Sequence, residues 1–190
     1  MIGLFVFLGN PGSQYKKTRH NLAWLILENL SIYPDLLWKE KFKGDFALIN
    51  KNGDQKVFLR PSTYMNLSGE SVQAALTFFK NKPKEVLVFH DDIELPFGQV
   101  SLKFSGGLAG HNGLKSIANS LGTKDFYRMR LGVGRPLKGE AAAHVLGRFT
   151  SQEEAELEFY FKKMDALVPE LLAGEPGEFA PLKLFQTGSK

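Results

Sequence analysis

Residues 2–24 read IGLFVFLGNPGSQYKKTRHNLAW, and this stretch decides the fold class. Residues 2–8 are almost continuously apolar, which is typical of a strand buried on both faces. Asn-Pro-Gly at 10–12 then ends the strand in a turn. From His20 onward the apolar residues follow the spacing of one helix face, which predicts a helix over 20–32. A buried strand, a turn and an amphipathic helix together indicate an α/β protein.

Strands and helices continue to alternate along the rest of the chain. Further strands are expected over 46–50, 56–60, 85–91, 99–104 and 126–134. The first two of these form a hairpin around Lys51–Asn52–Gly53, where Asn-Gly is the turn signal. Further helices are expected over 70–80, from about 114, and from about 151 to 172.

The end of the chain is expected to be a helix followed by an irregular tail. Either Thr150 with Glu153 or Ser151 with Glu154 makes a capping box that opens the last helix. Beyond it, glycines and prolines at 174, 176, 177 and 181 break regular structure. The sequence therefore predicts a single α/β domain over residues 1–190, with a C-terminal helix and tail from about residue 150. Its core is a mixed, partly parallel twisted sheet flanked by helices.

Composition and charge narrow the function classes. Cysteine is absent, which excludes disulfides and thiolate chemistry and suits the cytoplasm. None of the four histidines has the i, i+4 spacing of a helical zinc site, so neither metal nor cofactor is expected. No apolar run approaches the ~20 residues that cross a bilayer, so no membrane partner is expected.

The charge is unevenly distributed. Residues 1–150 hold 20 Lys and Arg against 12 Asp and Glu, a net charge of +8, whereas residues 151–190 carry −4. A basic body favours a polyanionic partner such as nucleic acid. A surface that is basic only for solubility is the alternative.

Polar side chains gather where the predicted strands end. Asn10, Asn66 and Asp91 each follow a strand, and parallel neighbours would bring them to one crevice, with His20 at its rim. A His beside an Asp can act as a general base, and Asn amides can donate to an oxyanion. Because no serine lies in a G-x-S-x-G elbow, this set favours attack by water on an acyl group. Alternatively, His20 and Asn66 begin or cap helices, and Asp91 and Asp92 are ordinary loop carboxylates.

A glycine-rich segment with basic residues on both sides forms a second constellation. Residues 106–116 read GGLAGHNGLKS, with Lys103 before them and Arg128, Arg130 and Arg135 after. Glycines permit close backbone approach, and the cations suit phosphate groups. The segment lacks the dinucleotide fingerprint between a strand and a helix, so it is a weak nucleotide signal. A solvated basic face is the alternative.

Four segments carry a family resemblance: LGNPGSQYKKTRHN, RPSTYMNLSG, HDDIELPFGQVSLKFSGGLAGHNGLKSI and FYRMRLGVGRP. Together they resemble bacterial peptidyl-tRNA hydrolase, collinearly from residue 4 to about 150. The resemblance implies a metal-independent esterase that frees peptides from tRNA after premature release from the ribosome. It implies peptidyl-tRNA as partner, bound by its acceptor stem and 3′ end, and a monomer.

The resemblance also assigns roles to single residues. His20 of T-R-H-N matches the catalytic base, and Asp91, rather than Asp92, matches the Asp that orients it. The residues that match the family's contacts to the peptide and the 3′ end are Asn10, Tyr15, Met65, Asn66 and Asn112. The residues that match its clamp on tRNA phosphate are Lys103 and Arg130. The chain departs from the family at Phe7 and Ala23, where Gly is frequent, and neither change removes a catalytic group.

The mechanism expected from these residues is base-assisted hydrolysis. His20, held by Asp91, deprotonates a water that attacks the ester carbonyl, and Asn10 is the leading side chain for stabilising the oxyanion. An RNA-binding protein without hydrolytic activity is a second reading, although a pure binder has no need of this trio. A nucleotide-binding enzyme that uses the glycine loop is a third, disfavoured by the missing fingerprint.

Overall fold

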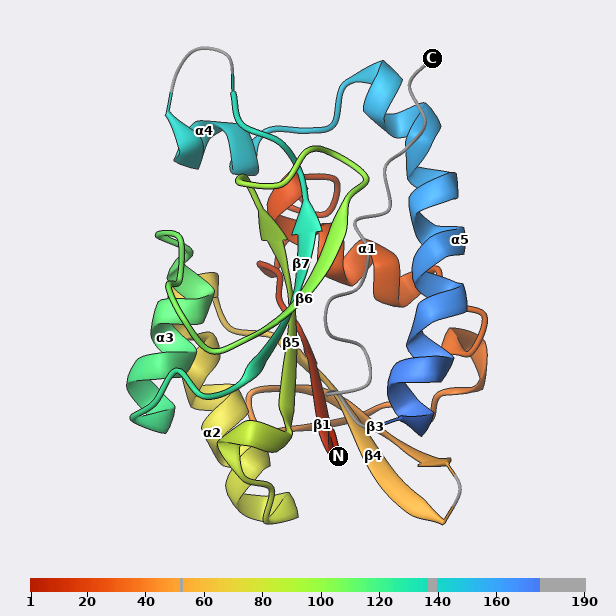
Figure 1. Cartoon of the computed structure of the whole chain (residues 1–190), viewed down its shortest axis with the longest axis vertical. Coiled ribbons are helices and arrows are strands. Elements are labelled where there is room, and N and C mark those ends of the chain that lie inside the picture. The colour runs from red at the N-terminus through yellow and green to blue at the C-terminus, as the bar shows by residue number, and fades with distance from the viewer. Residues whose placement is uncertain (52, 137–139, 175–190) are drawn as a thin grey trace.

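The protein is built around one seven-stranded sheet (Figure 1). The computed structural model describes residues 1–51, 53–136 and 140–174. The strands lie in the order β2-β3-β4-β1-β5-β7-β6. Their bounds are β1 Leu4–Phe7, β2 Lys39–Lys41, β3 Gly44–Lys51, β4 Asp54–Pro61, β5 Val86–Asp92, β6 Val100–Phe104 and β7 Tyr127–Gly132. The four central strands β4, β1, β5 and β7 are parallel, and β2, β3 and β6 pair antiparallel at the edges, which confirms the predicted mixed sheet.

Helices cover both faces of the sheet. The α-helices are α1 Leu22–Glu28, α2 Ser68–Phe79, α3 Asn112–Leu121, α4 Ala141–Leu146 and α5 Ser151–Ala173. Short 3₁₀ turns are η1 Arg19–Asn21, η2 Tyr33–Asp35, η3 Met65–Leu67 and η4 Pro83–Glu85. Figure 1 shows α2 and α3 on one face of the sheet and α1 and α5 on the other. Among the described residues, no helix combines the length and the apolar character needed to cross a membrane.

Strand β1 explains why the first apolar run is continuous. Phe5 and Phe7 pack into the core under α1 and α5, whereas Leu4 and Val6 pack into the core under α2 and α3. Because successive side chains of a strand point to opposite faces, a strand covered on both sides has to be apolar throughout. Phe7 also stacks on Phe89 of β5, with ring centroids 4.4 Å apart.

The first helix is shorter than predicted. The apolar spacing predicted it over 20–32, but α1 ends at Glu28. The Asn29 side chain donates to the Leu25 carbonyl at 2.8 Å, and such a local bond competes with further helical turns. Pro34 then lacks the backbone N–H that a continued α-helix would need for its bond to the Leu30 carbonyl. The chain instead makes the turn η2 and reaches the edge strand β2, which the sequence did not predict.

The later elements agree more closely with expectation. Thr150 and Glu153 form the capping box of α5, with Thr150 Oγ1 accepting from the Glu153 amide at 3.2 Å. Helix α4 was not predicted, because its six residues are too few to show a helical period. Asn52 of the predicted turn and the predicted irregular tail over 175–190 lie outside the described residues.

Candidate active site

A cleft of about 560 Å³ opens at the carboxyl ends of the central strands. The expectation that the strands preceding Asn10, Asn66 and Asp91 are parallel neighbours is confirmed, since β1 pairs parallel with both β4 and β5. This strand-end cleft gathers seven of the residues singled out from sequence, namely Asn10, Tyr15, His20, Met65, Asn66, Asp91 and Asn112. Its remaining wall comes partly from α4, through Ala141, Ala142, Val145 and Leu146.

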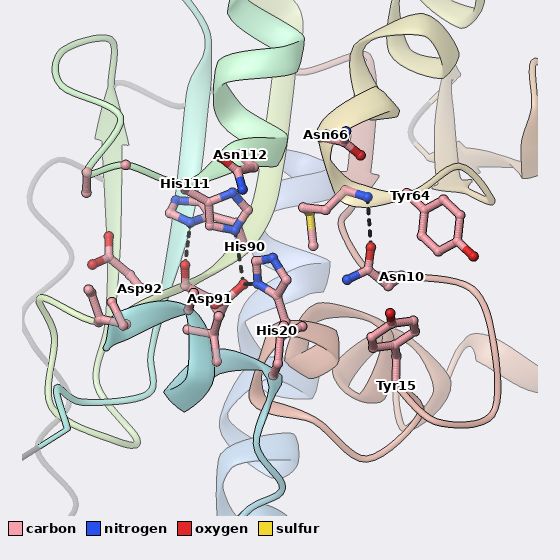
Figure 2. Close-up of a pocket in the computed structure, with 18 residues that line it drawn as sticks. Asn10, Tyr15, His20, Tyr64, Asn66, His90, Asp91, Asp92, His111 and Asn112 are labelled. Atoms are coloured by element: carbon pink, nitrogen blue, oxygen red, sulfur yellow. Dashed lines mark hydrogen bonds and ion pairs between the residues drawn. The ribbon is translucent and has the colours of Figure 1, made fainter. Parts of the chain in front are cut away.

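His20 and Asp91 form a direct pair in the cleft (Figure 2). His20 Nδ1 lies 2.8 Å from Asp91 Oδ1. Asp91 is in β5, and His20 is in the middle of η1, directly before α1. Both residues are nearly buried, with 3 % and 8 % of their surfaces exposed. A carboxylate at this nitrogen fixes the ring tautomer, which leaves Nε2 as the acceptor.

His111 is a second imidazole on the same carboxylate oxygen. Its Nε2 lies 3.0 Å from Asp91 Oδ1, and its ring centroid is 5.0 Å from that of His20. His111 also caps α3, because its Nδ1 accepts from the Gly113 amide at 3.1 Å and from the Leu114 amide at 3.4 Å. An Nδ1 that accepts from amides requires the proton on Nε2, which therefore donates to Asp91. The three residues lie close enough to hold a metal ion, but this tautomer leaves His111 Nε2 without a lone pair for one.

His111 is a site residue that the sequence did not predict. The residue lies in the G-H-N-G segment, directly before Asn112, so its position was visible. Its double use as a helix cap and a carboxylate partner depends on how α3 meets β5, which no local pattern reveals.

The charges around Asp91 explain how a buried carboxylate stays ionised. Burial would raise the pKa of Asp91, but the His20 and His111 rings outweigh that effect and hold its pKa well below the ordinary value. His90, the neighbour in β5, also has a lowered pKa, but for a histidine this favours the neutral form. Burial, helped by His111, lowers the pKa of His90 to about 3, so this ring is neutral at pH 7.

Asn10 is held by its backbone and by one side-chain oxygen. The Asn21 side chain accepts from the Asn10 amide and donates to the Asn10 carbonyl, each at 2.9 Å. Asn10 Oδ1 accepts from the Met65 amide at 2.8 Å. The side-chain nitrogen of Asn10 makes no hydrogen bond within the described parts of the chain, and it points into the cleft (Figure 2). The site therefore offers one fixed amide donor beside the His20–Asp91 pair.

Two further asparagines, Asn66 and Asn112, line the strand-end cleft. Asn66 is exposed in η3, and its side chain caps no helix, so the capping alternative for Asn66 is wrong. Asn112 is the exposed first residue of α3. Tyr15 and Tyr64 also line the cleft and lie on either side of Asn10 in Figure 2.

The expected phosphate ligands lie outside the strand-end cleft. Arg130 is in β7, and its Nε donates to Asp92 Oδ2 at 2.7 Å. Lys103 is exposed in β6 and makes no ion pair with any described residue. Arg128 lies beside it in the register and is 2 % exposed, with its guanidinium donating to the carbonyls of Ser105 and Gly107. The alternative of a solvated face is therefore wrong for Arg128, which holds the glycine loop.

A buried His–Asp pair and an oriented side-chain amide, gathered in a cleft at the strand ends, define the class of protein as an enzyme with an α/β fold. Comparison with known proteins gives the family. The family model for peptidyl-tRNA hydrolase matches residues 4–186. The chain belongs to the peptidyl-tRNA hydrolase family.

Individual relatives agree with this assignment. The peptidyl-tRNA hydrolase of Treponema pallidum is 50 % identical over 159 residues, covering 81 % of this chain and 79 % of the relative. That of Geobacter metallireducens is 46 % identical over 155 residues, covering 81 % and 80 %. The crystal structure of peptidyl-tRNA hydrolase from Acinetobacter baumannii superposes with a TM-score of 0.77 at 35 % identity, covering 90 % of each chain.

Proposed function

We propose that this enzyme cleaves the ester bond between a peptide and the 3′ ribose of its tRNA, with His20 as the general base. The reaction returns tRNA to use after premature release from the ribosome. The observation that carries the proposal is the 2.8 Å contact of His20 Nδ1 with buried Asp91, beside the unpaired amide of Asn10.

Proton transfer begins at His20 Nε2. With Nδ1–H held by Asp91, Nε2 accepts a proton from water as the water attacks the ester carbonyl carbon. The carbonyl oxygen becomes an oxyanion, and Asp91 stabilises the imidazolium that forms at the same time. The imidazolium then returns its proton to the ribose oxygen as the ester bond breaks. No covalent enzyme intermediate is needed.

Asn10 is placed to stabilise the oxyanion. Its Oδ1 is fixed by the Met65 amide, so its amide nitrogen is oriented before substrate arrives. A donor that needs no reorganisation is worth more than a mobile one. Asn66, Asn112, Tyr15 and Met65 then hold the peptide and the 3′-terminal nucleotide.

The tRNA body binds outside the strand-end cleft, at Lys103 and Arg130. Lys103 is supported by its exposure and by the absence of an ion pair with any residue that the structure describes. Arg130 donates to Asp92 through Nε, and the other nitrogens of its guanidinium suit a phosphate oxygen.

We also propose that residues 1–190 form one domain, supported by the single sheet and the helices packed on its two faces.

The test is release of peptide from an N-blocked aminoacyl-tRNA. His20→Ala should lower kcat by roughly 10²–10⁴-fold, the usual contribution of general base catalysis. Binding of the same tRNA, measured separately, should change little. A His20→Ala enzyme with near-normal kcat would eliminate His20 as the base.

A further inference from the structure

Arg19, the residue before the proposed base, has no part in the chemistry but carries an unusual set of bonds. Its side chain is 8 % exposed and does not line the strand-end cleft. Nε donates to Glu153 Oε1 at 3.2 Å, and one terminal nitrogen donates to Glu153 Oε2 at 2.5 Å. This two-pronged geometry fixes direction as well as charge.

The remaining donors of Arg19 hold the corner between α4 and α5. Its other terminal nitrogen donates to the carbonyl of Arg148 at 2.6 Å and to that of His144 at 3.4 Å. Its backbone amide donates to the Gly147 carbonyl at 3.1 Å, and Thr18 pairs with Arg148 as a β-bridge. The turn that carries His20 is thus attached to the segment that ends α4.

The far end of this connection belongs to a long helix that packs on the core. Glu153 lies in the first turn of the 23-residue helix α5, and its Oε2 also accepts from the Thr150 amide at 2.6 Å. The helix is anchored in the core by buried side chains, among them Tyr160, Met164 and Leu167. The Arg19 bond lowers the pKa of Glu153 in spite of its partial burial, so the carboxylate is charged at pH 7.

The near end of the connection has little support of its own. Turn η1 is only three residues long, and its N-cap Thr18 makes no side-chain capping bond. A single 3₁₀ turn does not fix an imidazole by itself. The orientation of the His20 backbone therefore depends on contacts from outside the turn, which Arg19 makes with the α4–α5 corner and Asn21 makes with Asn10.

We propose that Glu153, acting through Arg19, is a positioning residue for peptidyl-tRNA hydrolysis. The pair fixes His20 relative to the α4 wall of the strand-end cleft, which Val145 and Leu146 help to form. The C-terminal helix is thereby part of the catalytic apparatus, although none of its residues lines the cleft. The inference rests on the proposed role of His20 as base.

Glu153→Gln tests the proposal, because it keeps the size of the side chain and removes its charge. We expect kcat/KM for N-blocked aminoacyl-tRNA to fall about ten- to hundredfold, the scale of a displacement of the order of 1 Å. We expect both a lower kcat, from the displaced base, and a higher KM, from the shifted α4 wall. The matched control is Glu154→Gln, which removes the same charge from an exposed neighbour and should leave both constants unchanged.

Each variant is assayed well below its own melting temperature, so that stability alone does not lower the rate. Nitrogen chemical shifts of the His20 ring should change in Glu153→Gln and not in Glu154→Gln. If Glu153→Gln does not fold, Glu153→Asp serves instead, because it keeps the charge but shortens the reach to Arg19. Wild-type kcat and KM in a folded Glu153 variant would overturn the proposal, leaving the pair a purely stabilising one.

The outcome is separable from that of the proposed function. An active His20→Ala enzyme would show that His20 is not the base, whatever the activities of the Glu153 variants are. An inactive His20→Ala enzyme together with fully active Glu153 variants would contradict only the positioning role of Glu153.

Discussion

Asp91 concentrates the electrostatics of the site on a single residue. Its Oδ1 receives both His20 and His111, and its own pKa is held low by them. His90, next in the strand, is buried and neutral, and its Nδ1 contacts the Asp91 carbonyl at 2.8 Å. A charged ring at this position would compete for the Asp91 carboxylate. Because His90 is neutral, the carboxylate interacts with His20 and His111 alone among the three rings.

The low pKa of His90 predicts a pH dependence of stability. The value is about 3 in the folded chain against an ordinary 6.5, so between these values only the unfolded chain binds the proton. The stabilisation is therefore complete above pH 6.5 and is lost as pH falls toward 3. Between pH 7.5 and pH 5 the free energy of unfolding should fall by about 2 kcal/mol from this group. Urea denaturation at each pH measures it.

His90→Gln is the matched variant for this measurement, because it removes the titrating ring and keeps a polar side chain. Its free energy of unfolding should change less with pH over the same range, by about the amount that His90 contributes. Parallel pH dependences for the wild type and the variant would contradict a buried neutral His90.

Helices α2 and α3 determine how far apart Asn66 and Asn112 lie in the cleft. Asn66 precedes α2 and Asn112 begins α3, and the two helices meet at Gly69. The Gly69 amide donates to Ser116 Oγ at 2.9 Å, and a Cβ on Gly69 would collide with the Ser116 carbonyl oxygen. Because that oxygen belongs to the backbone, it has no rotamer by which to move away.

Gly69→Ala should therefore lower the free energy of unfolding by about 1–3 kcal/mol, the usual cost of overpacking. The higher helix propensity of alanine works against this effect but is smaller, at most about 1 kcal/mol. Gly107→Ala is the control, since a Cβ there meets nothing within 4 Å. Chemical denaturation compares the two, and equal stabilities would contradict the close helix contact.

The elements differ in how far the sequence predicts them. The continuous apolar run of β1 predicts a central parallel strand, and with it the meeting of Asn10, Asn66 and Asp91 at strand ends. The contact of His20 with Asp91 follows from that arrangement. The sequence does not predict the contributions of His111 and α4 to the site, because these depend on how separate elements pack together rather than on any local pattern.

At the scale of the whole molecule, the net charge is unevenly distributed along the chain. It is +8 over residues 1–150 and −4 over residues 151–190. Phosphate contacts release counterions, so affinity for tRNA should weaken steeply as salt rises. Lys103 is the exposed lysine expected to make one such contact.

Lys103→Ala should weaken tRNA binding and reduce the slope of log affinity against log salt by about 1. Lys84→Ala removes the same charge from η4, which precedes the amino end of β5, and should leave the slope unchanged. Binding titrations at several salt concentrations measure both. Identical slopes for the two variants would remove Lys103 from the phosphate contacts.

The central claim is that His20 and Asp91 act as one unit, and a double-mutant cycle on kcat tests it most directly. His20→Ala, Asp91→Asn and the double variant are compared with wild type in release of peptide from N-blocked aminoacyl-tRNA. If Asp91 acts through His20, the double variant is no slower than His20→Ala alone, because residues of one unit are not additive. A double variant slowed by the product of the two single effects would contradict the account.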